Sequence, residues 1–320
     1  MTPRARVFSL VALAAVVASG VVVIGVLATR SNVPTVKPRK GAPPLALDLG
    51  VRNDAEAQAL RHAENLYDHQ QRDRAAAIFK RYDSLEAEVG AALAAWPADT
   101  VRRLQTLAAE NQKSSLVAFN LGSALYWSRR DQEAETAWRA AAKLQPDSLY
   151  AVAAGNFLHP RFAPWLPVFV PSFPIPSRIA GLSPPQQFAA FRQDAKKGGA
   201  HAKILYGVAL QRLYHPLSAE AEFAAAEREA PKDPEAVAAA AVGLFDKADP
   251  SKAFSRLGPL VRVFPHAQTV RFHLGLLLLW MAQVPQAREE LQKARAEGPG
   301  TPLGQQASGY LQALRKPGTR

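Results

Sequence analysis

The chain has 320 residues, 48% of them hydrophobic, which is long enough for a buried core and excludes wholesale disorder. It contains no cysteine, so disulfide frameworks, cysteine-ligated zinc or iron–sulfur sites and thiol catalysis are excluded. The net charge of +12 does not indicate a nucleic-acid groove, because residues 1–40 hold six basic side chains and no acid, which is half of the excess. We therefore expect no nucleic-acid partner.

Residues 1–6 form a short basic tail, and residues 7–29 are 23 consecutive uncharged residues rich in Val, Ala and Leu. As a helix this run would extend roughly 34 Å, enough to cross a bilayer core of about 30 Å. It exceeds the 7–15 apolar residues typical of a signal peptide, which favours a transmembrane anchor over a cleaved signal ending near Val26-Leu27-Ala28. Because so short a basic tail stays inside, we expect a single-pass protein of the cell membrane with its soluble part outside the cytoplasm.

Residues 30–52 are rich in proline and basic side chains and show no helical period. They predict a semi-extended linker that holds the globular part away from the membrane. A contact of the basic residues with anionic headgroups is the alternative.

The body of the chain repeats every 34 residues. Steps of 12, 16, 19 and 24 residues from a small residue lead in four frames to an alanine, a large residue, an alanine or leucine, and a proline. The frames are Gly122, Ala134, Trp138, Ala141 and Pro146; Gly207, Ala219, Phe223, Ala226 and Pro231; Ala241, Ala253, Leu257, Leu260 and Pro265; and Gly275, Ala287, Leu291, Ala294 and Pro299.

This spacing describes a pair of antiparallel helices. Small residues twelve apart let the helices cross closely, the large residue fills the gap beside the crossing, and the proline ends the second helix. Each pair leaves one apolar face, so pairs must stack. The pattern resembles the tetratricopeptide repeat (TPR), which implies an all-α, right-handed solenoid with a concave groove for peptides or partner proteins. We expect a TPR-like α-solenoid of about five to seven helix-turn-helix repeats after an N-terminal transmembrane helix.

The remaining segments follow from the phase of these frames. Residues 53–112 predict about two degenerate repeats, and residues 113–299 the TPR-like repeats with a proline-rich hydrophobic insertion at about 159–183. One further repeat is expected around that insertion, with helices at 149–158 and 184–197. Residues 300–320 predict a capping helix and a tail.

The insertion is apolar without being helical. Residues 159–176, HPRFAPWLPVFVPSFPIP, contain six prolines, which forbid a regular helix, and apolar side chains too dense for a free surface, among them Trp165, Phe169 and Phe173. The segment packs into the groove of its own array, docks on a partner, or enters the membrane interface. We favour self-packing, because such a segment left free would invite aggregation.

No arrangement of residues indicates catalysis or a cofactor. The seven histidines form no HExxH pair, and neither a phosphate-binding GxxxxGK[ST] loop nor a GxSxG motif occurs. We expect a protein that is not an enzyme and that uses neither a cofactor nor a metal.

The leading hypothesis is a membrane-anchored TPR scaffold that binds another protein or peptide through its concave face. A non-catalytic accessory subunit of an envelope-located enzyme or of a secretion or assembly complex is the alternative. The resemblance implies that the groove is lined by first-helix residues: Phe119, Ser123, Tyr126, His201, Ile204, Val208, Gln211, Ala238, Val242, Phe245, Phe272, Leu276 and Leu279. Trp165, Phe169 and Phe173 of the insertion join them as candidate partner-binding residues.

Overall fold

The computed structural model describes residues 38–315, in which 16 helices are joined by turns and extended segments and no β-strand occurs. These residues form two compact units, an N-terminal unit of residues 38–158 and a C-terminal unit of residues 159–315. Within the described range no helix combines the length and the apolarity needed to cross a membrane. The predicted anchor at 7–29 and the last five residues of the tail lie outside that range.

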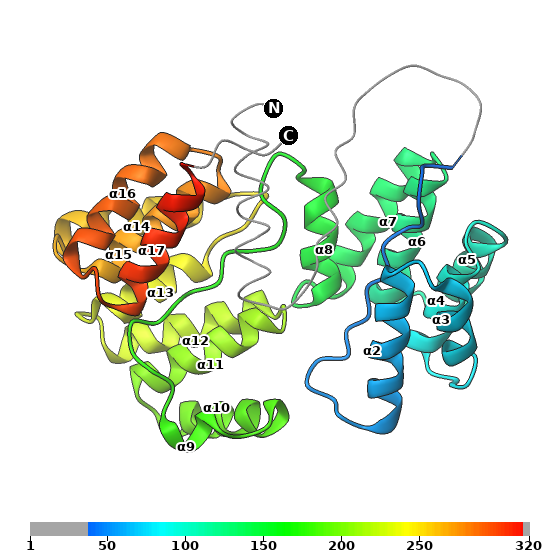
Figure 1. Cartoon of the computed structure of the whole chain (residues 1–320), viewed down its shortest axis with the longest axis horizontal. Coiled ribbons are helices and arrows are strands. Elements are labelled where there is room, and N and C mark those ends of the chain that lie inside the picture. Colours follow the sequence, from blue (N-terminus) through cyan, green and yellow to red (C-terminus); the bar gives the residue numbers. More distant parts are fainter. Residues whose placement is uncertain (1–37, 316–320) are drawn as a thin grey trace. The chain divides into compact units, whose positions relative to one another are not determined.

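The N-terminal unit is built from antiparallel helix pairs (Figure 1). Its helices are α2 (Ala55–Asp68), α3 (Arg72–Phe79), α4 (Leu85–Ala94), α5 (Thr100–Glu110), α6 (Ser115–Trp127), α7 (Asp131–Leu144) and α8 (Leu149–Leu158). Successive helices pack on one another, and α8 packs on both α6 and α7. The region 53–112 therefore holds two hairpins, α2–α3 and α4–α5.

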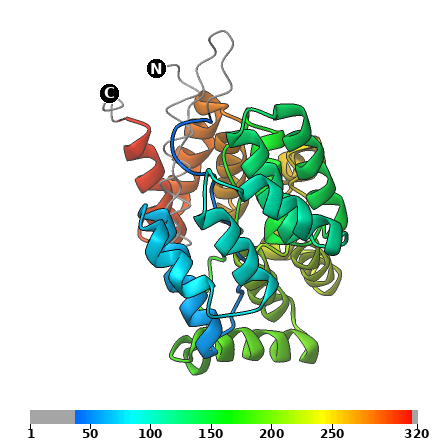
Figure 2. The ribbon, with the colours of Figure 1, turned by 90° about the vertical axis from the view of Figure 1, so that its right-hand side faces the viewer.

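The C-terminal unit continues the same architecture. Its helices are α9 (Ser177–Ala180), α10 (Pro184–Lys197), α11 (Ala200–Arg212), α12 (Pro216–Glu229), α13 (Pro234–Gly243), α14 (Ser251–Val263), α15 (Gln268–Trp280), α16 (Val284–Glu297) and α17 (Pro302–Ala313). Helix α10 lies along α11 (Figures 1 and 2), and α17 closes the unit by packing on α16.

Helix starts follow from capping side chains. Five N-cap oxygens accept a hydrogen bond from a backbone N–H two or three residues further on, which satisfies a donor that the helix itself leaves free. These caps are Asp54, Ser84, Ser114, Asp233 and Thr301. The second helices end as the spacing predicts, because α7, α12, α14 and α16 each stop two residues before the proline of their frame.

The contacts within the hairpins confirm the 34-residue phase. In α7, α12, α14 and α16 the buried residues are those at steps 12, 16 and 19 of each frame. A Cβ atom placed on Gly122, Gly207 or Gly275 would lie 2.6, 2.4 or 2.8 Å from the side chain of Trp138, Phe223 or Leu291. A Cβ at these positions would force the neighbouring side chain to shift, so glycine suits the close crossing in these three frames. The fold is therefore TPR-like in its internal contacts.

The turn inside four of the hairpins has a feature that the sequence pattern does not show. Seven residues after a small residue of the first helix the backbone is left-handed at a residue other than glycine, with φ between 57° and 66°. The residues are Gln70, Arg129, Tyr214 and Ala282, and Gln70 lies seven residues after Ala63 of α2. Non-glycine residues rarely adopt this conformation, so its recurrence marks α2–α3 as a hairpin of the same kind as the later ones.

First and second helices differ in burial. The second helices bury one narrow stripe, whereas α13 is buried at every residue from 235 to 242 and α15 at every residue from 275 to 280. A helix that is buried all round needs cover on every side. Neighbouring helices cover only part of such a circumference, and the extended segments described below cover the rest.

The repeat predicted around the insertion is divided between the two units. Helices α8 and α10 have the predicted bounds, 149–158 and 184–197, but α8 packs on α6 and α7 of the N-terminal unit, while α10 packs on α9 and α11 of the C-terminal unit.

Two glycines provide a test of the hairpin contact. A Cβ at Gly207 would lie 2.4 Å from the buried ring of Phe223, whereas one at Gly309 of α17 would have nothing within 4 Å. We expect Gly207→Ala to lower the free energy of unfolding by about 1–3 kcal/mol through overpacking. Gly309→Ala should raise it by about 0.5–1 kcal/mol, because alanine favours a helix over glycine. Denaturant unfolding measures both, and equal effects would contradict the repeat phase.

Candidate functional site

The insertion covers the first helices of the C-terminal unit. We call residues 159–176 the strap, the green segment that leads into α9 in Figure 1. Its residues Ala163 and Phe169 belong to the core formed by α11 to α17, and Leu166, Val168, Val170 and Phe173 pack against that core. The strap therefore packs on its own array, as the sequence favours.

The strap is held by its main chain. Three of its N–H groups donate hydrogen bonds to side chains on three different first helices. The bonds run from Phe169 to Gln211 Oε1 of α11 at 2.8 Å, from Val170 to His273 Nε2 of α15 at 2.9 Å, and from Ser172 to Glu235 Oε2 of α13 at 3.3 Å. This pattern is the way in which a groove recognises an extended peptide, independently of the peptide's side chains.

Phe169 occupies the centre of the contact. Its side chain is fully buried, stacks on the His273 ring with centroids 4.1 Å apart and an interplanar angle of 10°, and lies 5.9 Å from the ring of Phe223. Phe223 is also the large residue that fits against Gly207. The strap and the hairpin crossing thus share one packed aromatic cluster.

Aromatic residues also fix both ends of the strap. Trp165 lies 5.0 Å from the ring of Tyr214, and its carbonyl accepts a hydrogen bond from the Trp280 indole at 3.3 Å. At the other end Phe173 stacks on His201 at 4.0 Å. The strap therefore runs across α11, α13 and α15 from one edge to the other.

The N-terminal unit contains a second occupied groove. Residues 38–49, here called the N-terminal segment, alternate between buried and partly buried from residue 42 onwards, with Pro43, Leu45, Leu47 and Leu49 buried. They lie within the predicted linker, yet they are not a solvated tether. An extended chain places alternate side chains on one face, so this face packs against the helices.

Helix side chains hold the N-terminal segment by its main chain as well. Asn120 of α6 accepts from the Ala46 N–H at 3.2 Å and donates to the Ala46 carbonyl at 3.0 Å. Three further bonds join the Leu47 N–H to Glu64 at 3.2 Å, the Asp48 N–H to the Tyr150 hydroxyl at 2.9 Å, and the Tyr67 hydroxyl to the Pro43 carbonyl at 2.6 Å.

Arg39 fastens the beginning of this segment to the end of α6. Its backbone N–H donates to the Trp127 carbonyl at 2.7 Å, and its Nε donates to the Tyr126 carbonyl at 2.8 Å. The guanidinium lies 3.7 Å above the Tyr126 ring and pairs with Asp131 at 2.8 Å. One side chain thus combines an ion pair with a cation–π contact.

Burial changes the protonation of the groove acceptors. It lowers the pKa of His273 to about 4, so the ring is neutral. His273 Nδ1 lies 2.7 Å from the Thr269 carbonyl, which can only accept, so Nδ1 carries the proton and Nε2 is free to accept from Val170. Burial also raises the pKa of Glu64 to about 8 and shifts that of Glu235 upward.

The predicted groove residues divide into two groups. Tyr126, His201 and Gln211 contact an extended segment directly. The others are buried, and the core contains them: Phe119, Ser123, Ile204, Val208, Ala238, Val242, Phe245, Phe272, Leu276 and Leu279. Among the insertion residues Phe169 is buried, whereas Trp165 and Phe173 are partly buried.

Sequence reasoning missed the polar acceptors Asn120, Glu235 and His273. Glu235 is the only polar residue of α13, and Asn120 and His273 each stand between two apolar neighbours on α6 and α15. Because a buried polar side chain requires a partner, that isolation is the signal that could have identified them.

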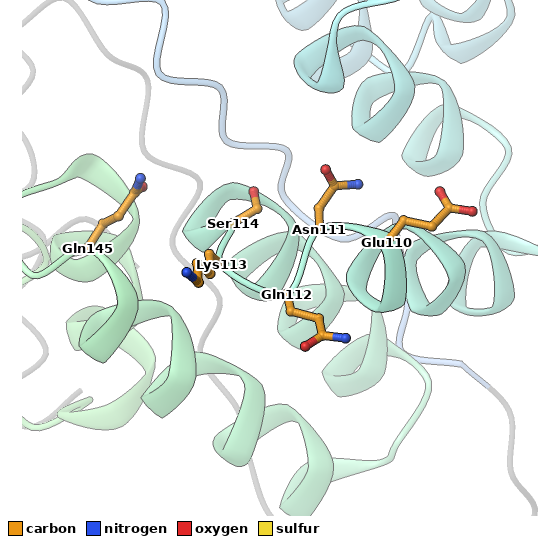
Figure 3. Close-up of a pocket in the computed structure, with 6 residues that line it drawn as sticks. All are labelled: Glu110, Asn111, Gln112, Lys113, Ser114 and Gln145. Atoms are coloured by element: carbon orange, nitrogen blue, oxygen red, sulfur yellow. The ribbon is translucent and has the colours of Figure 1, made fainter.

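The N-terminal unit also has an open depression of about 500 Å³ between the ends of α5, α6 and α7 (Figure 3). Its lining is polar and consists of Glu110, Asn111, Gln112, Lys113, Ser114 and Gln145. In Figure 3 Asn111 and Glu110 extend to one side of the loop and Gln112 to the other, so the side chains do not converge on one point. Across residues 38–315 no three His, Cys, Asp or Glu side chains gather as a metal site would need.

No family model and no curated protein matches this chain. Among solved structures, the APC/C hetero-tetramer Cut9–Hcn1 is 13% identical, with 82% of this chain and 56% of that chain covered and a TM-score of 0.27. The C-terminal part of a TPR repeat-containing protein from Cytophaga hutchinsonii is 13% identical, with 79% of this chain and 99% of that chain covered and a TM-score of 0.29. The TPR2AB domain of yeast Sti1 in its pHSP90 complex is 11% identical, with 82% of this chain and 98% of that chain covered and a TM-score of 0.29. At such identities and TM-scores, the repeat assignment rests on the contacts within this chain's own hairpins.

Phe169 tests whether the strap belongs to the folded core. We expect Phe169→Ala to lower the free energy of unfolding of the C-terminal unit by about 3–5 kcal/mol, the usual cost of emptying a buried aromatic site. Ile175→Ala, in the same strap at a side chain that is 39% exposed, should change it by less than about 0.5 kcal/mol. Denaturant unfolding measures the free energy of unfolding of both variants. A small decrease for both would show that the strap is not part of the folded core.

His273 makes the stability of the C-terminal unit depend on pH. Its pKa is about 4 when folded and 6.5 when unfolded, so the unfolded chain binds the extra proton. The free energy of unfolding is therefore highest above pH 6.5 and falls by roughly 3 kcal/mol as the pH decreases to 4. The raised pKa of Glu235 acts in the opposite direction, so wild type must be compared with His273→Gln. Hydrogen exchange of α11 to α16 measures the free energy of unfolding at each pH, and the loss at low pH should occur in wild type only. The same pH dependence in both proteins would contradict the role of His273.

Proposed function

We propose that this chain is a membrane-anchored TPR-like scaffold that binds another protein by the main chain of an extended segment. The body faces away from the cytoplasm, and residues 7–29 form the anchor. No catalytic step belongs to this function. The partner is a protein or peptide, recognised at the first helices of the repeats.

One observation carries the proposal. In both units, side chains of the first helices bind the N–H and C=O groups of an extended proline-containing segment, through Asn120 in the N-terminal unit and through Gln211 and His273 in the C-terminal unit. A groove whose side chains hydrogen-bond to main-chain groups suits a polypeptide ligand. Its present occupants are the chain's own segments.

The membrane anchor and its orientation rest on the sequence. Residues 7–29 are long enough to cross a bilayer, and the tail before them is short and basic. The alternative role, a non-catalytic accessory subunit of an envelope complex, is favoured by the occupied grooves, because partners would then contact the outer second helices.

A cysteine-directed crosslinker tests orientation and partner together, since the natural chain has no cysteine. His201→Cys places the probe at the strap edge, at a side chain that is 57% exposed, and Gln292→Cys places it on the exposed face of α16. With a membrane-impermeant photoreactive maleimide on intact cells, we expect both variants to be labelled and His201→Cys alone to give a discrete protein adduct.

The other outcomes are equally informative. Labelling that requires permeabilised cells would reverse the orientation. Adducts from Gln292→Cys alone would favour the accessory-subunit role. A mature N-terminus near Thr29 would indicate a cleaved signal instead of an anchor.

A further inference from the structure

The C-terminal groove presents polar acceptors in a register that matches one stretch of extended main chain. Gln211, Glu235 and His273 come from three helices and accept from three N–H groups within four consecutive strap residues. Residue 171 of that stretch is a proline, which has no N–H to satisfy. Over residues 169–172, donors and acceptors therefore match one for one.

These acceptors favour a groove that is filled by main chain. Glu235 and His273 are buried while the strap is in place, and a buried acceptor without a donor costs more free energy than the bond itself contributes. A segment buried here needs partners for its N–H groups as well as a fit for its side chains. A segment that replaces the strap is therefore held best when it offers the same donors in the same register.

The strap is attached in the manner of a ligand. From residue 164 to 175 it forms no helix or strand. Between Phe169 and Ser172 it is joined to the unit by side-chain acceptors and by the stacking of Phe169 on His273. A tethered segment of this kind competes with an external ligand at an effective concentration of about millimolar, so an external segment that binds more tightly displaces it.

We infer that the C-terminal groove is the binding site for a proline-rich partner segment that presents a phenylalanine followed by two further main-chain N–H donors, and that the strap is a built-in competitor for this site. The inference rests on the proposed scaffold function and names its ligand class. The phenylalanine ring stacks on His273, as Phe169 does at 4.1 Å. The prolines keep the segment extended and reduce the entropy lost on binding.

A synthetic peptide of residues 163–175, APWLPVFVPSFPI, is the probe. Added to the full chain carrying Phe169→Ala, whose own strap is weakened, the labelled peptide should bind at least about tenfold more tightly than to the wild-type chain. The same peptide with its Phe169 replaced by Ala should not bind. Adding His273→Leu to the Phe169→Ala chain removes one acceptor and should abolish binding. Fluorescence anisotropy measures binding of the unchanged peptide to the wild-type chain, to Phe169→Ala and to the double variant, and binding of the altered peptide to Phe169→Ala.

A second measurement applies to the wild-type fold in case Phe169→Ala does not fold. A fluorophore on Ile175→Cys reports strap release, and one on Gln306→Cys of α17 is the control. Excess peptide should lower the anisotropy at residue 175 and leave residue 306 unchanged. Lack of saturable binding to folded Phe169→Ala, or an unchanged signal at residue 175, would overturn the inference.

These results are separable from the test of the scaffold function. A peptide that fails to bind, together with a partner adduct at His201→Cys, would leave the scaffold function standing and remove only this ligand class. A peptide that releases the strap while no partner adduct forms would overturn the scaffold function instead.

Discussion

The first helices of these repeats are apolar almost around their whole circumference, and the rest of the structure depends on covering them. Helix α13 is buried from residue 235 to 242 and α15 from 275 to 280, while the second helices bury only a stripe of three residues. Stacked hairpins leave the concave side of such helices open to water. In each unit an extended segment covers this side, and removing the apolar surface from water stabilises the fold.

Main-chain recognition explains why a few polar side chains stand among these apolar helices. An extended segment without a neighbouring strand has unpaired N–H and C=O groups, and burying them unpaired is costly. Asn120, Gln211, Glu235 and His273 supply the partners. The same burial keeps His273 neutral, so the acceptor that Val170 needs is present at neutral pH.

Each of the two units holds one extended segment. The N-terminal segment lies in the groove of residues 38–158 and is fastened by Arg39 to the end of α6. The strap occupies the groove of residues 159–315 and carries Phe169, which packs on Phe223 of the hairpin crossing. In a groove that already holds polypeptide, any external segment has to compete with the chain's own segment.

The repeat follows from the sequence alone. Small, large and proline positions recur at fixed short distances, so the crossing at Gly207, the fit of Phe223 and the end of α12 before Pro231 could be predicted from local spacing. Only the tertiary structure decided where the extended segments lie. Prolines remove any period from them, and their partners are distant in sequence, with Ala46 and Asn120 74 residues apart and Val170 and His273 103 residues apart. No local pattern encodes such a pairing, because it depends on how stacked helices bring their buried acceptors into line.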